Sequence, residues 1–159
     1  MADEEVMLAK MTRREFREGI EAGKFTTAMI CVASNEQHSE HLAMEHDLAS
    51  VVHIAREAAK RLFPRVVVTV PMAVGISEHH MHHKGTISAR PGGWLAVLFD
   101  VVESMVRHGA KNVLIFNGHG GNSLPVMGVI DQMRYYLKSN APGVNLQFCS
   151  YWDLLSREL

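Results

Sequence analysis

The sequence has few of the features that mark secreted, membrane-spanning or nucleic-acid-binding proteins. It has only two cysteines, Cys31 and Cys149, which form no disulfide framework and favour a reducing compartment. The N-terminal segment MADEEVMLAK has no apolar core, and no run approaches the roughly eighteen apolar residues of a membrane span. The formal net charge of -1 leaves no broad basic surface for nucleic acid. We therefore expect a cytoplasmic protein with no nucleic-acid partner and no membrane partner.

Histidine, in contrast, is abundant and clustered. The chain has 159 residues, of which 47% are hydrophobic and 21% charged, as in an ordinary globular domain, so we expect residues 1–159 to form one domain. Ten residues are histidine. Eight of them lie in three places: His38, His41 and His46; His79, His80, His82 and His83; and His119. Imidazole is the commonest metal ligand and the usual proton carrier near neutral pH, so this clustering points to a metal site or to acid–base chemistry.

Short apolar runs alternate with helical patterns along the chain. Thr12 and Glu15 form a capping-box pattern that opens a helix ending near Gly23. The strands predicted after it are residues 26–32, 66–70, 113–116 and 146–151. The other predicted helices begin at Leu48, at Trp94 and near Pro125, and residues 117–122 are predicted to form a tight turn. This alternation predicts a three-layer α/β/α fold with a mostly parallel sheet.

The polar segments that follow the first three predicted strands carry the chemistry. Parallel sheets bind ligands at the carboxyl ends of their strands, so these segments are expected to converge. They bring together Glu36, His38, Asp47 and His119, with Asp47 placed as an N-cap. Two carboxylates and two imidazoles suit Zn, Mn or Fe better than Ca or Mg, and one carboxylate could bridge two such ions. A water held by two ions would be acidified into a nucleophile.

Each of these residues also has a simpler interpretation. Asp47 by itself is most often a helix cap, and Glu36 by itself a solvated loop acid. His119 lies in a glycine-rich turn that could be structural or could cradle a phosphate through backbone N–H groups. Residues 79–83 could be a solvated histidine run. The metal interpretation is preferred because it explains the residues together, whereas two carboxylates would repel a phosphate.

Four sequence blocks, in order, resemble the creatininase family. Glu36-Gln37-His38, His41-Leu42 and Asp47 resemble its E-Q-H-x-x-H-L…D pattern, and residues 117–122 are similar to its N-G-H-G-G-N turn. Residues 85–88 (GTIS) resemble its G-T-[IL]-S segment, with His80 at the histidine position before it. Residues 151–153 resemble the Y-W-D of the creatininases proper.

The resemblance implies a creatininase-like fold and a site with two divalent transition-metal ions. By this resemblance the metal ligands are Glu36, His38, Asp47 and His119, with Asp47 as the bridge. It implies a catalytic role for His80, support of the ligands by His41, and substrate contacts from Trp152, Gly120 and Gly121. The implied activity is hydrolysis of a non-peptide or cyclic amide C–N bond in a small molecule, such as creatinine or a formamide.

The chain also departs from the family pattern. Family members usually carry a further C-terminal segment with a glutamate, and some place an acid two residues after the turn histidine, where this chain has Gly121. The domain is therefore expected to be incomplete at its C-terminus and to need a second polypeptide, or another copy of itself, to complete the site. The alternative function is that of a non-catalytic or incomplete subunit of a creatininase-like complex.

Overall fold

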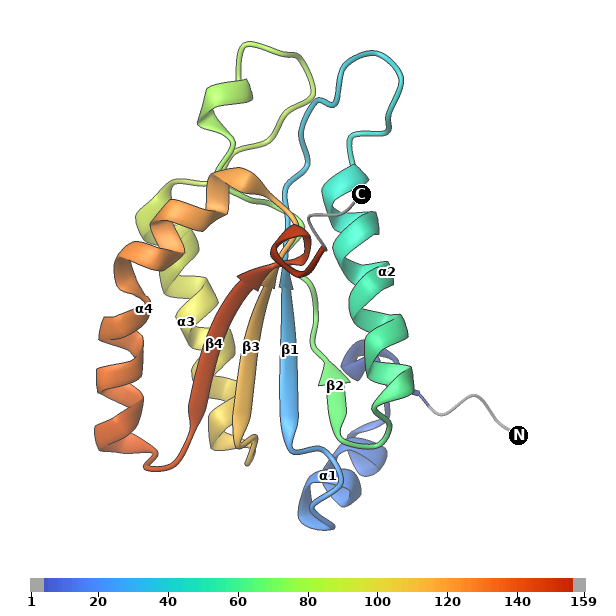
Figure 1. Cartoon of the computed structure of the whole chain (residues 1–159), viewed down its shortest axis with the longest axis vertical. Coiled ribbons are helices and arrows are strands. Elements are labelled where there is room, and N and C mark those ends of the chain that lie inside the picture. Colours follow the sequence, from blue (N-terminus) through green and yellow to red (C-terminus); the bar gives the residue numbers. More distant parts are fainter. Residues whose placement is uncertain (1–4, 156–159) are drawn as a thin grey trace.

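The computed structural model describes residues 5–155 and has four parallel strands between layers of helices (Figure 1). The helices are α1 (Arg13–Glu21), α2 (His46–Arg61), α3 (Pro91–Arg107) and α4 (Gly120–Asn140). The strands are β1 (Thr27–Val32), β2 (Val66–Val68), β3 (Asn112–Asn117) and β4 (Asn145–Ser150). Of three short 3-10 helices in the described residues, η1 (Leu8–Lys10) precedes α1, η2 (Glu78–His80) lies between β2 and α3, and η3 (Tyr151–Leu154) follows β4. Within the described residues, no helix is long and apolar enough to cross a membrane.

The sheet has the order β2-β1-β3-β4, and its central strands end at one level. The last residues of β1 and β3, Val32 and Asn117, are register partners, and Asn117 in turn is paired with Ser150 at the end of β4. All pairings are parallel. Because the carboxyl ends of β1, β3 and β4 coincide, the loops that leave them start side by side, as predicted for the first and third strands, whereas β2 ends earlier, at the level of Met29.

Helices cover both faces of the sheet, which confirms the predicted α/β/α layers. Ile30 and Val32 of β1 pack into the cluster formed with α3 and α4, whereas Met29 and Cys31 pack on the opposite face with α2. Successive strand side chains point to opposite faces, so a strand covered on both sides must be apolar throughout. This explains the continuous run TAMICV of β1. Leu98 of α3 is completely buried in the first cluster.

Several predicted boundaries are confirmed and others are wrong. The capping box is present, with the Thr12 N–H 2.6 Å from Glu15 Oε2, and Gly23 follows α1 with a φ of 69°. The second strand stops at Val68: the Thr69 N–H still donates to the Met29 carbonyl of β1, but the chain then leaves β1 at residues 70–71 and returns to it at Met72. Pro71 has no N–H to continue the ladder.

The beginnings of α2, α3 and α4 lie earlier than predicted. In α2 the N-cap is Glu45, so Asp47 is not the cap but a residue of the first turn. Helix α3 begins at Pro91, whose fixed φ suits a first helical position. Helix α4 begins at Gly120, which makes Pro125 an interior residue instead of a first-turn residue. The predicted tight turn is therefore the end of β3, two linking residues and the first turn of α4.

Candidate metal centre

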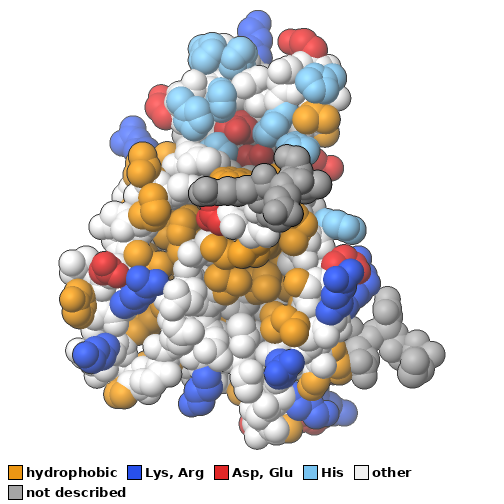
Figure 2. Space-filling model, in the orientation of Figure 1, with side chains coloured by type: hydrophobic (Ala, Val, Ile, Leu, Met, Phe, Trp, Pro, Cys, Tyr) orange, Lys and Arg blue, Asp and Glu red, His pale blue; other side chains and the backbone are white. Residues whose placement is uncertain are grey.

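Carboxylates and histidines gather at the carboxyl edge of the sheet. Glu36 and His38 lie in the loop after β1, and Asp47 lies in the first turn of α2. His79 and His80 belong to η2 in the loop after β2, and His119 is the N-cap of α4. Figure 2 shows histidine side chains crowded around acidic ones at this end of the molecule.

The two carboxylates are buried and face the same histidine. Glu36, Asp47 and His119 are 5%, 6% and 3% exposed. His119 Nδ1 lies 3.2 Å from Glu36 Oε1 and 3.0 Å from Asp47 Oδ2. The other oxygen of Asp47 lies 3.0 Å from His38 Nε2. Asp47 therefore presents one oxygen to each histidine, which is the geometry of a carboxylate that can span two cations.

Two groups of donor atoms could each hold a cation. One group is Glu36, His38 and Asp47, and the other is Glu36, His79 and His119. In each group the donor atoms lie within 4.8 Å of one another. Carboxylate oxygen with imidazole nitrogen is the donor set that Zn, Mn and Fe favour.

The outer nitrogens of two histidines are held by backbone carbonyls. His119 Nε2 lies 3.1 Å from the carbonyl oxygen of Ile76, and His38 Nδ1 lies 3.3 Å from that of Glu36. A carbonyl can only accept, so each outer nitrogen carries the proton when the ring is neutral. The inner nitrogen then presents its lone pair to the carboxylates. Metal-binding histidines are oriented in this way, and the residues present therefore fit a divalent transition metal.

The charges around His119 alter its protonation. Burial by itself lowers the pKa of His119, but the hydrogen bond to Asp47 and the charge of Glu36 raise it, and the net shift is upward. When His119 is protonated in the metal-free chain, its imidazolium offsets part of the negative charge of the carboxylates. A divalent cation would take over this task, because it and the proton compete for the same nitrogen.

Ser77 holds Glu36 in place, although nothing in the sequence pattern singled it out. Its hydroxyl is completely buried, and its Oγ donates to Glu36 Oε2 over 2.7 Å. Ser77 Oγ also lies 3.1 Å from His119 Nε2 and contacts the Ser34 hydroxyl. Ser77 thus ties the loop after β2 to the loop after β1. A serine in a polar loop carries no local signal for such a role.

The asparagines of the 117–122 segment position His119. Asn117 Oδ1 accepts the His119 N–H over 3.1 Å, and Asn117 Nδ2 donates to the His119 carbonyl over 2.8 Å. Asn122 Nδ2 donates to the Ala33 carbonyl over 3.2 Å, and its Oδ1 accepts the Ile76 N–H over 3.0 Å. The segment therefore fixes the histidine through two amides and connects the loops after β1 and β2.

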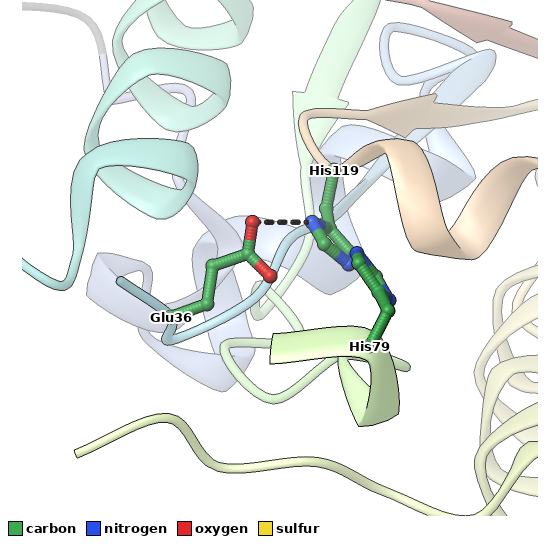
Figure 3. Close-up of side chains that lie close together, drawn as sticks. All are labelled: Glu36, His79 and His119. Carbon is green, nitrogen blue, oxygen red and sulfur yellow. Dashed lines mark ion pairs between the residues drawn. The ribbon is translucent and has the colours of Figure 1, made fainter. Parts of the chain in front are cut away.

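His79 lies at the centre, a role that its sequence position did not reveal. Its ring stacks on that of His119 with centroids 5.8 Å apart and an interplanar angle of 12°, and Glu36 completes the group (Figure 3). A Cβ on Gly121 would lie 2.9 Å from His79 Cε1 and 2.5 Å from His119 Nε2. Gly121, expected as a substrate contact, therefore makes room for the two rings.

The remaining expected site residues lie at varying distances from this centre. His80 Nε2 is 4.0 Å from Glu36 Oε1, and burial is the largest of the effects that lower the pKa of His80. Gly120 borders open space, and Trp152 lies in η3 after β4, where it is 37% exposed and contacts the Tyr151 ring. His41 is exposed, and the hydrogen bonds within residues 5–155 include none from its ring. In the structure Ser77 and the two carbonyls support the ligands, and the expected support from His41 stays a prediction.

The fold and the donor cluster together define a parallel α/β protein with a candidate metal centre at the carboxyl edge of its sheet. The profile of the Creatininase family, described as creatinine amidohydrolase, matches residues 9–158. The chain belongs to this family.

Individual relatives agree with this assignment. The creatinine amidohydrolase of Pseudomonas putida is 24% identical over 94% of this chain and 59% of its own length. A mycofactocin precursor peptide peptidase of Mycobacterium ulcerans (strain Agy99) is 29% identical over 67% of this chain and 45% of its own length. A creatininase crystal structure superposes with a TM-score of 0.87 at 24% identity and covers 98% of this chain and 61% of its own. The chain thus spans about half to three fifths of the length of these proteins.

Proposed function

We propose that this chain binds two divalent transition-metal ions and belongs to a hydrolase that cleaves a non-peptide or cyclic amide C–N bond. The observation that carries the proposal is the buried carboxylate pair of Glu36 and Asp47, which lies beside Nε2 of His38 and Nδ1 of His119. Family membership supplies the reaction class. Zinc and manganese are the first candidates, because similar creatininase structures include a Zn-Zn type and an Mn form.

The residues divide the work in the following way. In this proposal Asp47 would hold one cation together with His38, and its other oxygen would reach a second cation held by His119 and His79. Glu36 is within reach of both and is braced by Ser77. Bound divalent ions supply Lewis acidity that polarises a carbonyl and lowers the pKa of a water molecule. Burial of the carboxylates strengthens these electrostatic effects, because little water is left to screen them.

The structure narrows the alternatives from the sequence. A phosphate site in the 117–122 segment is disfavoured, because both buried carboxylates lie beside His119 and would repel an anion. The interpretation of Asp47 as a helix cap alone is disfavoured as well, because the N-cap of α2 is Glu45.

A metal-binding subunit without activity of its own is the second candidate function. Trp152, Leu154 and Leu155 are exposed apolar residues directly after β4, where another chain or copy could add to the site. This arrangement is consistent with the expectation of a partner polypeptide.

Metal content and hydrolysis measured together test both candidates. Purified protein, stripped of metal and reloaded with zinc or manganese, is assayed by elemental analysis and then with creatinine, a formamide and a short peptide. We expect about two ions per chain and a loss of both ions and turnover in Glu36→Gln. Glu40→Gln, in the same loop after β1 but exposed, is the matched control. Two ions without hydrolysis would support the subunit function, and no bound metal would reject the proposal.

A further inference from the structure

Gln37 lies between two proposed metal ligands and contacts a third loop. Its backbone N–H donates to Thr86 Oγ1 over 3.3 Å, and its side-chain Nε2 lies 3.1 Å from His80 Nδ1. His80 is the histidine for which the site geometry provides a location but no role. The contact between Gln37 and His80 supplies that role.

The orientation of the Gln37 amide is determined by a second hydrogen bond. The backbone N–H of Ser39 donates to Gln37 Oε1 over 2.9 Å. Only the oxygen of an amide accepts, so the other end, Nε2, must be the NH2 group that faces His80. Ser39 has a φ of 60°, in the left-handed region that non-glycine residues rarely adopt. The loop therefore adopts an unusual backbone conformation at the residue that fixes this amide.

The amide in turn determines the tautomer of His80. A donor facing Nδ1 requires that Nδ1 carry a lone pair, so the single proton of the ring is on Nε2. His80 Nε2 lies 4.0 Å from Glu36 Oε1, near the carboxylate but too far from it for a hydrogen bond. Within residues 5–155 no hydrogen bond uses the Nε2–H. The N–H is thus available to a ligand at the metal centre.

We propose that Gln37 is a positioning residue that holds His80 as a neutral donor, and that the Nε2–H of His80 donates to the oxygen of the amide carbonyl as it gains negative charge. This inference rests on the proposed function and assigns His80 a hydrogen-bonding role. No proton leaves His80, so another group protonates the departing nitrogen. Fixed donors aimed at a developing negative charge stabilise the transition state more than the substrate.

Two substitutions of Gln37 separate this role from a structural one. Gln37→Glu keeps the size and an acceptor for the Ser39 N–H, but its second oxygen accepts from Nδ1–H and reverses the tautomer. Gln37→Met removes both contacts and leaves a mixture of tautomers. Gln132→Glu, on the exposed face of α4, controls for the added charge.

The tautomer is measured directly by NMR. Zinc-loaded protein labelled with 15N-histidine is examined at about pH 8, above the ordinary histidine pKa, and the His80 signals are identified by their loss in His80→Asn. We expect a proton on Nε2 in the wild type and in Gln132→Glu, and a proton on Nδ1 in Gln37→Glu. Sodium formate, a small ligand that presents oxygen, should shift the Nε2–H resonance in the wild type.

Kinetics complete the test. With a substrate found in the hydrolysis assay, Gln37→Glu should lower kcat by about 10²- to 10³-fold with little change in KM or zinc content, as for loss of an oxyanion donor. The kcat of Gln37→Met should lie between those of the wild type and of Gln37→Glu. The inference would be overturned if the proton of His80 were on Nδ1 in the wild type, or if Gln37→Glu left the tautomer unchanged. It would also be overturned if formate did not shift the Nε2–H resonance, or if kcat stayed unchanged although the tautomer had reversed. If no C–N substrate is cleaved, the proposed activity fails, while the tautomer and the formate shift still decide the donor geometry.

Discussion

Replacing Asp47 with asparagine should not lower the stability of the metal-free chain, but it should abolish the stabilisation by zinc. Asp47 and Glu36 are both buried, and their donor atoms in the shared group lie within 4.8 Å of each other. Two unit charges at about that distance repel by about 3.5 kcal/mol at an effective dielectric constant of about 20. The asparagine removes this repulsion without changing the size of the side chain.

The substitution also weakens two contacts. Asp47 Oδ1 and Oδ2 lie 3.0 Å from His38 Nε2 and 3.0 Å from His119 Nδ1, respectively. A hydrogen bond to a charged group contributes about 1.5–3 kcal/mol, and of the two contacts the one with His119 Nδ1 is such a bond. Relief of repulsion and loss of one contact therefore nearly cancel, and the metal-free variant should lie between unchanged and about 2 kcal/mol more stable.

Zinc should then distinguish the two proteins. A metal present at about a hundredfold excess over its Kd stabilises the folded state by about 2.7 kcal/mol. For a domain of this size that raises Tm by roughly 5–11 °C. The wild type should show this rise and Asp47→Asn should not, because the proposed bridge holds both ions.

The assay is thermal unfolding of chelator-treated protein with and without zinc, followed by circular dichroism. Asp100→Asn is the control, because Asp100 is an exposed acid on α3. A metal-free Asp47→Asn chain that is more than about 3 kcal/mol less stable than the wild type would mean that the carboxylate is structural, because loss of a needed buried partner costs that much. A full zinc shift in the variant would show that Asp47 is not a ligand.

Three further predictions follow from individual contacts. His79→Ala should lower bound zinc from two ions to one per chain in elemental analysis, because His79 belongs to only one donor group, whereas a second ion retained in full would exclude it as a ligand. Zinc affinity measured by competition titration should fall as pH falls through the histidine range, because the carboxylates outweigh burial and raise the pKa of His119, so that protons compete with zinc. In the metal-free chain the same raised pKa should contribute stability that is present at low pH and is lost as pH rises through it. A zinc affinity and a metal-free stability that both stay constant with pH would refute this. Gly118→Ala should cost about 1–3 kcal/mol in urea unfolding, because a Cβ there would lie 2.8 Å from both the Asp47 carbonyl oxygen and Val51 Cβ, and a cost near zero would contradict this close approach.

Local signals in the sequence account for the elements and for the general location of the site. The apolar run of β1, the capping box at Thr12 and the alternation of strands and helices are short-range patterns, and each predicted its element. The convergence of the loops required only the rule that parallel strands end at one edge. The predicted residues Glu36, His38, Asp47 and His119 do lie together there.

The missed features depend on contacts between distant segments. Ser77 and Glu36 are 41 residues apart, and no periodicity links them. His79 could not be distinguished from its histidine neighbours, because its place depends on the space above Gly121. The start of α4 differs from the prediction because Gly120 and Gly121 suggest a turn, whereas the hydrogen bonds of Asn117 and Asn122 hold this segment at a helix N-terminus.

The wide spacing of the ligands also governs when the centre can form. The group Glu36, His38 and Asp47 lies in one loop and the start of α2, whereas His119 follows β3, so the second group, Glu36, His79 and His119, meets only after the parallel pair β1 and β3 has joined. Such non-local pairing is slow, because a long loop must close before any contact compensates for the lost entropy. A nascent chain on the ribosome lacks the complete centre until His119 has emerged. Metal capture at the complete proposed centre would then be a late event, and it would slow unfolding more than it speeds folding, because the second ion would bind only chains that have already reached the native topology.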